Sequence, residues 1–234
     1  MTGRLYLIPN TLGECEIRDT IPQGVINITH SINHFIVEDV RTARRFLIKT
    51  GYPGKIDDIE FSLLNKHTRK EDIPGFLEPC KEGIHVGILS EAGVPAVADP
   101  GAIIVDYAHK MGIQVVPLTG PSSILLALMA SGLNGQSFSF LGYLPVKNNE
   151  LPGRIKEIEA YSARNNQTQI FIETPYRNMK LFSELVKICK SSTILGIAVN
   201  LTTPEEKIIV KKIEDWKNCK PDLDKKPAVF LIQG

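Results

Sequence analysis

The sequence predicts an α/β protein with two α/β domains, a mostly parallel sheet in the first and a mixed sheet in the second. The chain has 234 residues, of which 43% are hydrophobic, so it can bury the cores of two small domains. Up to about residue 118, short apolar runs alternate with helical patterns, which is typical of a parallel sheet. Beyond Gly120, some strand patterns follow one another directly, which favours a mixed sheet. We therefore expect domains at residues 1–119 and 120–234.

In the first domain, apolar runs alternate with helical patterns along the chain. The runs that indicate strands are residues 5–9, 34–37, 59–64, 85–90 and 114–118. Helical patterns cover residues 38–49, 71–81 and 101–111, the first with Asp39 as its N-cap and the second with Pro74 near its start.

The second domain begins with a helical pattern and continues with irregular alternation. Helices are expected at residues 124–131, 155–163 and 179–189. Strands are expected at residues 138–144, 169–173, 193–200, 208–213 and 228–232. The last of these strands have no helical pattern between them, which predicts antiparallel neighbours in the sheet.

Composition and missing motifs exclude several classes of protein. The net charge of +1 indicates no polyanion partner by itself, and four widely spaced cysteines form no CxxC pair. The histidines show no metal-ligand spacing, and the sequence contains neither a P-loop nor a G-x-G-x-x-G motif. No apolar run approaches the ~18 residues of a membrane span, and the N-terminal run is too short for a signal peptide. We expect a soluble, cytoplasmic protein without a metal site.

Two loops, within residues 85–101 and 115–123, are the most informative segments. Each follows an apolar run, breaks at Gly and Pro, and then opens a helix, so both should lie at the carboxyl ends of parallel strands, where α/β sheets bind ligands. Ser122 and Ser123, at a helix start, could bind a carboxylate or phosphate. The alternative is that these serines only cap the helix and that Gly93 and Pro95 form ordinary turns.

Six motifs in order resemble the tetrapyrrole methylase superfamily, and most closely its bacterial 16S ribosomal RNA 2'-O-methyltransferases. The segment at 36–41 is similar to Ala-Glu-Asp-Thr-Arg, and residues 90–101 resemble Ser-Asp-Ala-Gly-Thr-Pro followed by Asp-Pro-Gly. The remaining matches are residues 5–13, 116–133, 142–147 and 172–177. The resemblance covers nearly the whole chain.

This resemblance implies that S-adenosylmethionine binds in a cleft between the two domains, largely through backbone groups. Gly93, Pro95 and Val97 would approach its methionine and ribose parts, and Ser122 and Ser123 would bind its carboxylate. The adenine side would be formed by Asn200, Leu201, Pro227 and Ala228. The resemblance also implies a homodimer that acts on ribosomal RNA or the small ribosomal subunit.

The reaction implied is transfer of a methyl group to the ribose 2'-oxygen of a small-subunit cytidine. Because a hydroxyl has a high pKa, a general base is useful, and Glu38 is the candidate; alternatively Glu38 and Asp39 only favour the helix N-terminus. Lys147 is a second catalytic candidate. Cations that could contact phosphate or substrate are Arg41, Arg45 and Arg177, and further Arg44, Lys66, Arg69, Lys70 and Lys147.

Several departures from the family pattern leave other functions open. Residues 199–203 replace Arg-Glu-Leu-Thr-Lys without its charges, Val94 and Glu91 replace Thr and Asp, and the helix expected after the first loop is degraded around residues 21–25. One alternative is a methylase of a tetrapyrrole or other small molecule, which would show an apolar cleft without a basic rim. The other is a degenerate protein that binds S-adenosylmethionine without catalysis.

Overall fold

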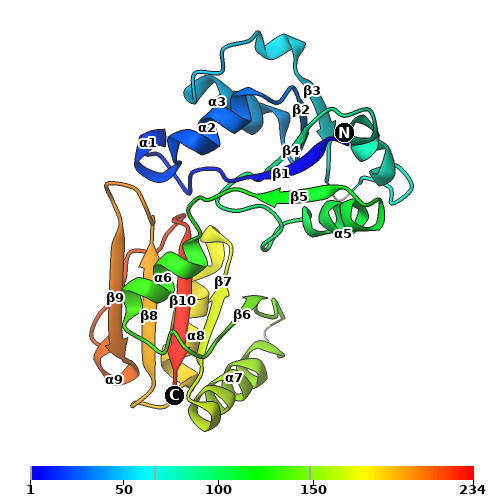
Figure 1. The fold of residues 1–234 in the computed structure, drawn as a ribbon. Coiled ribbons are helices and arrows are strands. Elements are labelled where there is room, and N and C mark those ends of the chain that lie inside the picture. The colour runs from blue at the N-terminus through cyan, green and yellow to red at the C-terminus, as the bar shows by residue number, and fades with distance from the viewer. Residues whose placement is uncertain (1, 66, 148) are drawn as a thin grey trace. The chain divides into compact units, whose positions relative to one another are not determined.

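The computed structural model describes residues 2–65, 67–147 and 149–234. The chain forms two compact units, Met1–Ser122 and Ser123–Gly234, which we call the first and second unit (Figure 1). Each unit holds one five-stranded sheet with helices packed against it. The predicted class, two α/β domains with a parallel and then a mixed sheet, is confirmed.

The sheet of the first unit is parallel throughout, in the order β3-β2-β4-β1-β5. Its strands are β1 (Arg4–Ile8), β2 (His34–Val37), β3 (Glu60–Leu63), β4 (Val86–Leu89) and β5 (Gln114–Pro117). The helices are α1 (Ile17–Thr20), α2 (Gln23–His30), α3 (Val40–Lys49), α4 (Glu78–Lys81) and α5 (Ala102–Lys110), with 3-10 turns at Ile56–Asp58 and Ile73–Leu77.

The inner strands of this sheet are buried on both faces, and successive side chains along a strand enter different clusters because they point to opposite faces. Phe35 of β2 belongs to the cluster that holds residues of α2 and α3, such as Phe46. Ile36, the next residue, belongs to the cluster that holds residues of α4 and α5, such as Ile104. The near-continuous apolar strands of the sequence therefore result from burial on two sides.

Two helix predictions in the first unit were wrong, and proline explains both. The helix expected at 71–81 is a 3-10 turn followed by the short α4, because Pro79 lacks the N–H that would continue the earlier turn. Around residues 21–25 the structure has an intact helix, α2, which begins directly after Pro22. A proline costs little at this position because the first N–H groups of a helix have no partner within it.

The second unit has a mixed sheet in the order β6-β7-β10-β8-β9, in which only β6 and β7 run parallel. Its strands are β6 (Phe138–Tyr143), β7 (Thr168–Ile172), β8 (Ile194–Val199), β9 (Lys207–Lys212) and β10 (Ala228–Gln233). Its helices are α6 (Ser123–Ser131), α7 (Leu151–Asn165), α8 (Asn178–Ile188) and α9 (Ile213–Trp216). Figure 1 shows α6 in front of β8 and β10, with α8 behind the sheet; α7 packs against α8, β7 and β10.

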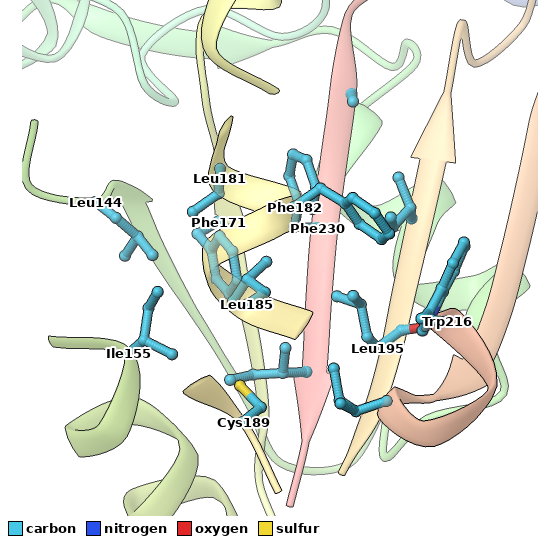
Figure 2. Packing of buried hydrophobic residues seen from close by; sticks show 14 of the residues in the cluster. Leu144, Ile155, Phe171, Leu181, Phe182, Leu185, Cys189, Leu195, Trp216 and Phe230 are labelled. Atoms are coloured by element: carbon cyan, nitrogen blue, oxygen red, sulfur yellow. The ribbon is translucent and has the colours of Figure 1, made fainter. Parts of the chain in front are cut away.

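Aromatic side chains fill the core of the second unit (Figure 2). Phe171 of β7 and Phe230 of β10 stack with ring centroids 5.9 Å apart, and Phe182 meets Trp216 edge-on at 5.4 Å. The buried Trp216 Nε1–H donates to the Leu195 carbonyl at 2.9 Å.

No helix among the described residues has the length and apolar character needed to cross a bilayer.

One buried carboxylate links α7 to the turn before β8. Glu159, only 6% exposed, accepts hydrogen bonds from Lys190 N–H at 2.7 Å and from the Thr193 hydroxyl at 2.5 Å. Burial and this carboxylate raise the pKa of the neighbouring Cys189 thiol to about 12. The polar cluster thus fixes how α8 leads into β8.

We expect Glu159→Ala to lower the free energy of unfolding by about 2–4 kcal/mol, because two donors lose a charged acceptor. The measurement is urea unfolding followed by circular dichroism. The control is Glu157→Ala on the same helix, whose exposed ion pair with Arg154 should contribute under about 1 kcal/mol. Equal losses in the two variants would contradict the assigned role of Glu159.

Candidate functional site

The parallel register of the first sheet brings the carboxyl ends of its strands to one edge. Val37 pairs with Leu63 on one side and Leu89 on the other, and Leu89 also pairs with Ile8. On the far side of β1, Leu7 pairs with Pro117. The loops that follow these strands therefore start together, at the edge where α/β sheets bind ligands.

Asn10 joins two of these loops. Its side-chain amide donates to the carbonyls of Ser90 and Glu91, both at 3.1 Å, and its backbone exchanges hydrogen bonds with Gly93 at 2.9 and 3.1 Å. Gly93 has φ +70°, and a Cβ there would lie 3.1 Å from Leu12 and 3.3 Å from the Pro121 carbonyl. Sequence reasoning named Gly93 but missed Asn10, whose only local signal is its place just after an apolar strand.

The loop between β4 and α5 has an unusual backbone. Ala96 and Ala98 adopt left-handed conformations with φ of 66° and 62°, which cost roughly 1–2 kcal/mol each for residues with a Cβ. Asp99 offsets this strain, since its Oδ1 accepts the N–H groups of Ala96 at 2.7 Å and Gly101 at 2.8 Å. Pro95 is buried, whereas Val97 is 45% exposed.

Glu38 follows β2 at the same edge and lies half-buried in a small cavity. The cavity is lined by Ile36, Val37, Glu38, Leu64, Ile88, Leu89, Asp99 and Gly101. Burial, together with the negative charges of Asp99 and Glu91, raises the pKa of Glu38 to about 7. A carboxylate with such a pKa can accept a proton near neutral pH and release it again.

The helix-capping role belongs to Asp39 and not to Glu38. Asp39 accepts the Thr42 N–H at 2.7 Å and the Thr42 hydroxyl at 2.9 Å, and these hydrogen bonds lower the pKa of Asp39. Glu38 lies outside α3 and has no part in this cap. The alternative that both carboxylates only favour the helix start therefore holds for Asp39 alone.

The basic residues near Glu38 differ in their partners. Arg41 and Arg45 are exposed on α3, and neither forms an ion pair within the part of the chain that the structure describes. Arg44, by contrast, pairs with Asp57 at 2.8 Å and lies over the Phe61 ring. Of the other basic candidates in this unit, Arg69 pairs with Asp72 and Lys70 is exposed. Lys66 lies outside the described residues.

The mixed sheet of the second unit also gathers predicted residues at one end. Ala228 at the start of β10 pairs with Val199 at the end of β8, and the neighbouring Val229 pairs with Ile172 at the end of β7. Because Ile172 also pairs with Tyr143 of β6, the loops after β6, β7 and β8 begin at this end. They carry Lys147, Arg177, Asn200 and Leu201, beside Pro227 and Ala228.

Hydrogen bonds hold the backbone before β10 from two sides. Asn200 N–H donates to the Pro227 carbonyl at 3.1 Å, and the Asn178 side-chain amide donates to the Lys226 carbonyl at 2.7 Å. Asn200 and Thr202 adopt left-handed conformations, with φ of 49° and 68°. Leu201 is buried.

Two buried polar atoms at this end are unsatisfied. Asn178 Oδ1 and Thr202 Oγ1 have no hydrogen-bond partner among the described residues, although such buried atoms are normally paired. Sequence reasoning missed both residues, because segments that are distant in sequence bury these two oxygen atoms. Asn178 Oδ1 can accept a hydrogen bond from a polar ligand, and Thr202 Oγ1 can accept or donate one.

The remaining candidates have carboxylate partners or lie where the two units join in sequence. Lys147 is exposed and pairs with Glu150 at 3.1 Å. Arg177 pairs at 2.9 Å with Glu173, a carboxylate that is buried. Ser122 ends the first unit, Ser123 opens α6 in the second, and both are partly buried.

Known proteins resemble this chain over nearly its whole length. The curated relatives include the ribosomal RNA small subunit methyltransferase I of Vibrio cholerae, 29% identical over 233 residues, which cover 98% of this chain and 77% of that protein. The protein of the same name from Bacillus subtilis is 31% identical over 221 residues, covering 92% and 70%.

Solved structures share the fold. The methyltransferase CobJ matches with a TM-score of 0.66 and 18% identity, covering all of this chain and 95% of that one. The uroporphyrin-III-C-methyltransferase of Thermus thermophilus matches with a TM-score of 0.53 and 20% identity, covering 100% and 93%.

A family model described as tetrapyrrole (corrin/porphyrin) methylases matches residues 35–217, a range that includes Glu38, the loop clamped by Asp99 and the end of β8. This match, and the Bacillus relative at 31% identity, agree with the six motifs of the sequence. The chain therefore belongs to the tetrapyrrole methylase family, and it is a methyltransferase that uses S-adenosylmethionine.

Proposed function

We propose that this methyltransferase modifies ribosomal RNA of the small subunit, at the ribose 2'-hydroxyl of a cytidine. The observation that carries the proposal is Glu38, a carboxylate with a pKa raised to about 7 just before α3. That helix carries two exposed guanidinium groups, of Arg41 and Arg45, which have no carboxylate partner among the described residues. A hydroxyl acceptor needs a base, and a nucleic acid needs cations. The printed names of the curated relatives support the same substrate.

When bound, S-adenosylmethionine supplies a methyl group activated by a sulfonium. In the first unit we propose Gly93, Pro95 and Val97 as its contacts, since Asn10 and Asp99 fix the backbone of their loop. We also propose Ser122, which follows β5 at the carboxyl end of the same sheet. In the second unit we propose Ser123, Asn200, Leu201, Pro227 and Ala228. The unsatisfied Asn178 Oδ1 and Thr202 Oγ1 fit a ligand rich in polar groups.

In the proposed reaction, Glu38 accepts the proton of the acceptor hydroxyl while that oxygen bonds to the methyl carbon. The protein otherwise contributes orientation and exclusion of water. Arg41 and Arg45 would bind phosphates of the substrate next to the base. To contact the substrate, Lys147 and Arg177 would each have to exchange a carboxylate partner, Glu150 or Glu173, for a substrate phosphate.

We also propose a homodimer in the cytoplasm, where bacterial ribosomal subunits are assembled. The support for self-association is the outer face of α6, an almost wholly apolar helix on which Leu125 is 50% and Met129 77% exposed. Exposed apolar patches commonly mark protein interfaces.

The first test is methyl transfer from labelled S-adenosylmethionine to unmodified small ribosomal subunits, with the product mapped to a nucleotide. We expect Glu38→Gln to reduce turnover by about a hundredfold or more, because the base is lost. Binding of S-adenosylhomocysteine should stay within about threefold, since its neutral sulfur does not interact strongly with the carboxylate.

The control is Glu60→Gln at the start of β3, where the amino ends of the strands lie, away from the carboxyl ends that carry Glu38. It should keep wild-type turnover. Equal turnover in Glu38→Gln would remove Glu38 from the mechanism, and label found only in small molecules would contradict the RNA proposal.

A second prediction concerns Gly93. Gly93→Ala should weaken binding of S-adenosylmethionine by more than about tenfold, because its Cβ would press on Leu12 and the Pro121 carbonyl and displace the loop. Isothermal titration calorimetry measures this directly. Gly51→Ala is the control, since Gly51 has a similar φ of 75° but no atom within 4 Å of an added Cβ. Similar losses in both variants would mean that backbone strain alone was measured.

A third prediction separates phosphate contacts from general charge. Replacing Arg41 and Arg45 together with alanine should weaken binding to small-subunit RNA and reduce the slope of log affinity against log salt by roughly 1.5 to 2. Arg4→Ala, an exposed cation at the amino end of β1, should leave the slope unchanged. Filter binding over a salt series measures both, and an unaltered slope in the double variant would exclude these phosphate contacts.

A further inference from the structure

Two carboxylates, Glu38 and Asp99, line one small and otherwise apolar cavity of the first unit. They come from different segments, the end of β2 and the loop after β4. The charges that act on Glu38 among the described residues are those of Asp99 and Glu91, both negative. The nearby Arg41 acts on Asp39 at the start of α3. Glu38 therefore faces negative charge on its cavity side.

The two carboxylates differ in what surrounds their oxygens. Burial raises the pKa of Asp99, and the two backbone N–H groups that it accepts, from Ala96 and Gly101, oppose this shift and fix its position. Glu38 has no such donors in the described part of the chain, and burial favours its neutral form. Of the two carboxylates, Glu38 is therefore the one assigned a proton near neutral pH, since its pKa is raised to about 7.

We propose that Asp99 is a positioning residue that, together with burial, keeps Glu38 partly protonated at neutral pH until a cationic cofactor binds at this edge, so that cofactor binding releases a proton and activates the base. The inference rests on the proposed function of Glu38. A positive charge brought near a carboxylate favours its ionised form. Asp99 also accepts hydrogen bonds from the backbone of the proposed cofactor loop. The conformation of this loop and the protonation of Glu38 therefore depend on the same side chain.

The charges of the reaction balance under this proposal. Glu38 enters as a carboxylate beside a sulfonium and leaves as a neutral acid, because it takes the proton of the acceptor hydroxyl. The oxygen–carbon bond forms as the carbon–sulfur bond breaks, and the bonding pair returns to sulfur, which becomes neutral. One positive and one negative charge disappear together, so Glu38 need be ionised only while the cation is present.

The test is calorimetric titration of the wild-type protein at pH 7, in buffers that differ in ionisation enthalpy. S-adenosylmethionine should release about half a proton, because a group with a pKa near 7 is half protonated at this pH. S-adenosylhomocysteine should release clearly less. The two ligands carry the same amino and carboxyl groups, so the difference between them reports the sulfonium alone.

Variants assign the proton to its source. Glu38→Gln should abolish the difference between the ligands. Asp99→Asn keeps a side-chain oxygen that can accept the loop N–H groups but removes the charge, so its release at pH 7 should fall and its maximum should move to lower pH. Asp106→Asn, an exposed carboxylate paired with Lys110, should behave as wild type.

Equal proton release with the two ligands, or an unchanged difference in Glu38→Gln, would overturn the inference while leaving the cofactor site intact. Wild-type release in Asp99→Asn would remove Asp99 from the coupling. If the wild-type protein bound neither ligand, the proposed function would fail together with the inference.

Discussion

The parallel register of β4 between β2 and β1 determines where Glu38, Asn10 and the loop after β4 lie. Because Leu89 pairs with both Val37 and Ile8, the chain leaves three strands at the same level, and Glu38, Asn10 and the loop after β4 start side by side. A shift of one residue would turn Phe35 and Ile36 to the wrong faces of the sheet, so the two hydrophobic layers enforce this register. Core packing thus positions a carboxylate that itself contributes nothing to the core.

Neighbouring carboxylates at this edge show how environment decides chemistry. Asp39 is partly exposed and accepts two hydrogen bonds from Thr42, which lower its pKa. One residue earlier, Glu38 is half-buried and faces other negative charges, which raise its pKa to about 7. Hydrogen bonding to the charged form prevails at the first position, whereas desolvation and repulsion prevail at the second. The first residue is therefore suited to capping a helix and the second to moving a proton.

The sequence was most informative where one local rule dominates. The predicted strand 34–37 and the Asp39 cap agree with the structure, because burial on both faces and a short side chain before a helix give strong local signals. The prediction failed at two prolines: Pro79 keeps the turn at Ile73–Leu77 from continuing as one helix into α4, whereas α2 begins directly after Pro22. Asn10, Asn178 and Thr202 were missed because their roles depend on bonds, or missing bonds, to segments far along the chain.

The departures at residues 199–203 weigh less than the sequence suggests, because this end of the second unit is organised through its backbone. Val199 is buried within β8, and Asn200 is held by its N–H to the Pro227 carbonyl. The left-handed conformations of Asn200 and Thr202 turn the chain, and Thr203 closes the turn through its hydroxyl to the Asn200 carbonyl at 2.9 Å. A ligand recognised by backbone groups depends on the turn and less on the charges that the family pattern carries there. Loss of those side chains is therefore compatible with the cofactor contacts that we propose at Asn200 and Leu201.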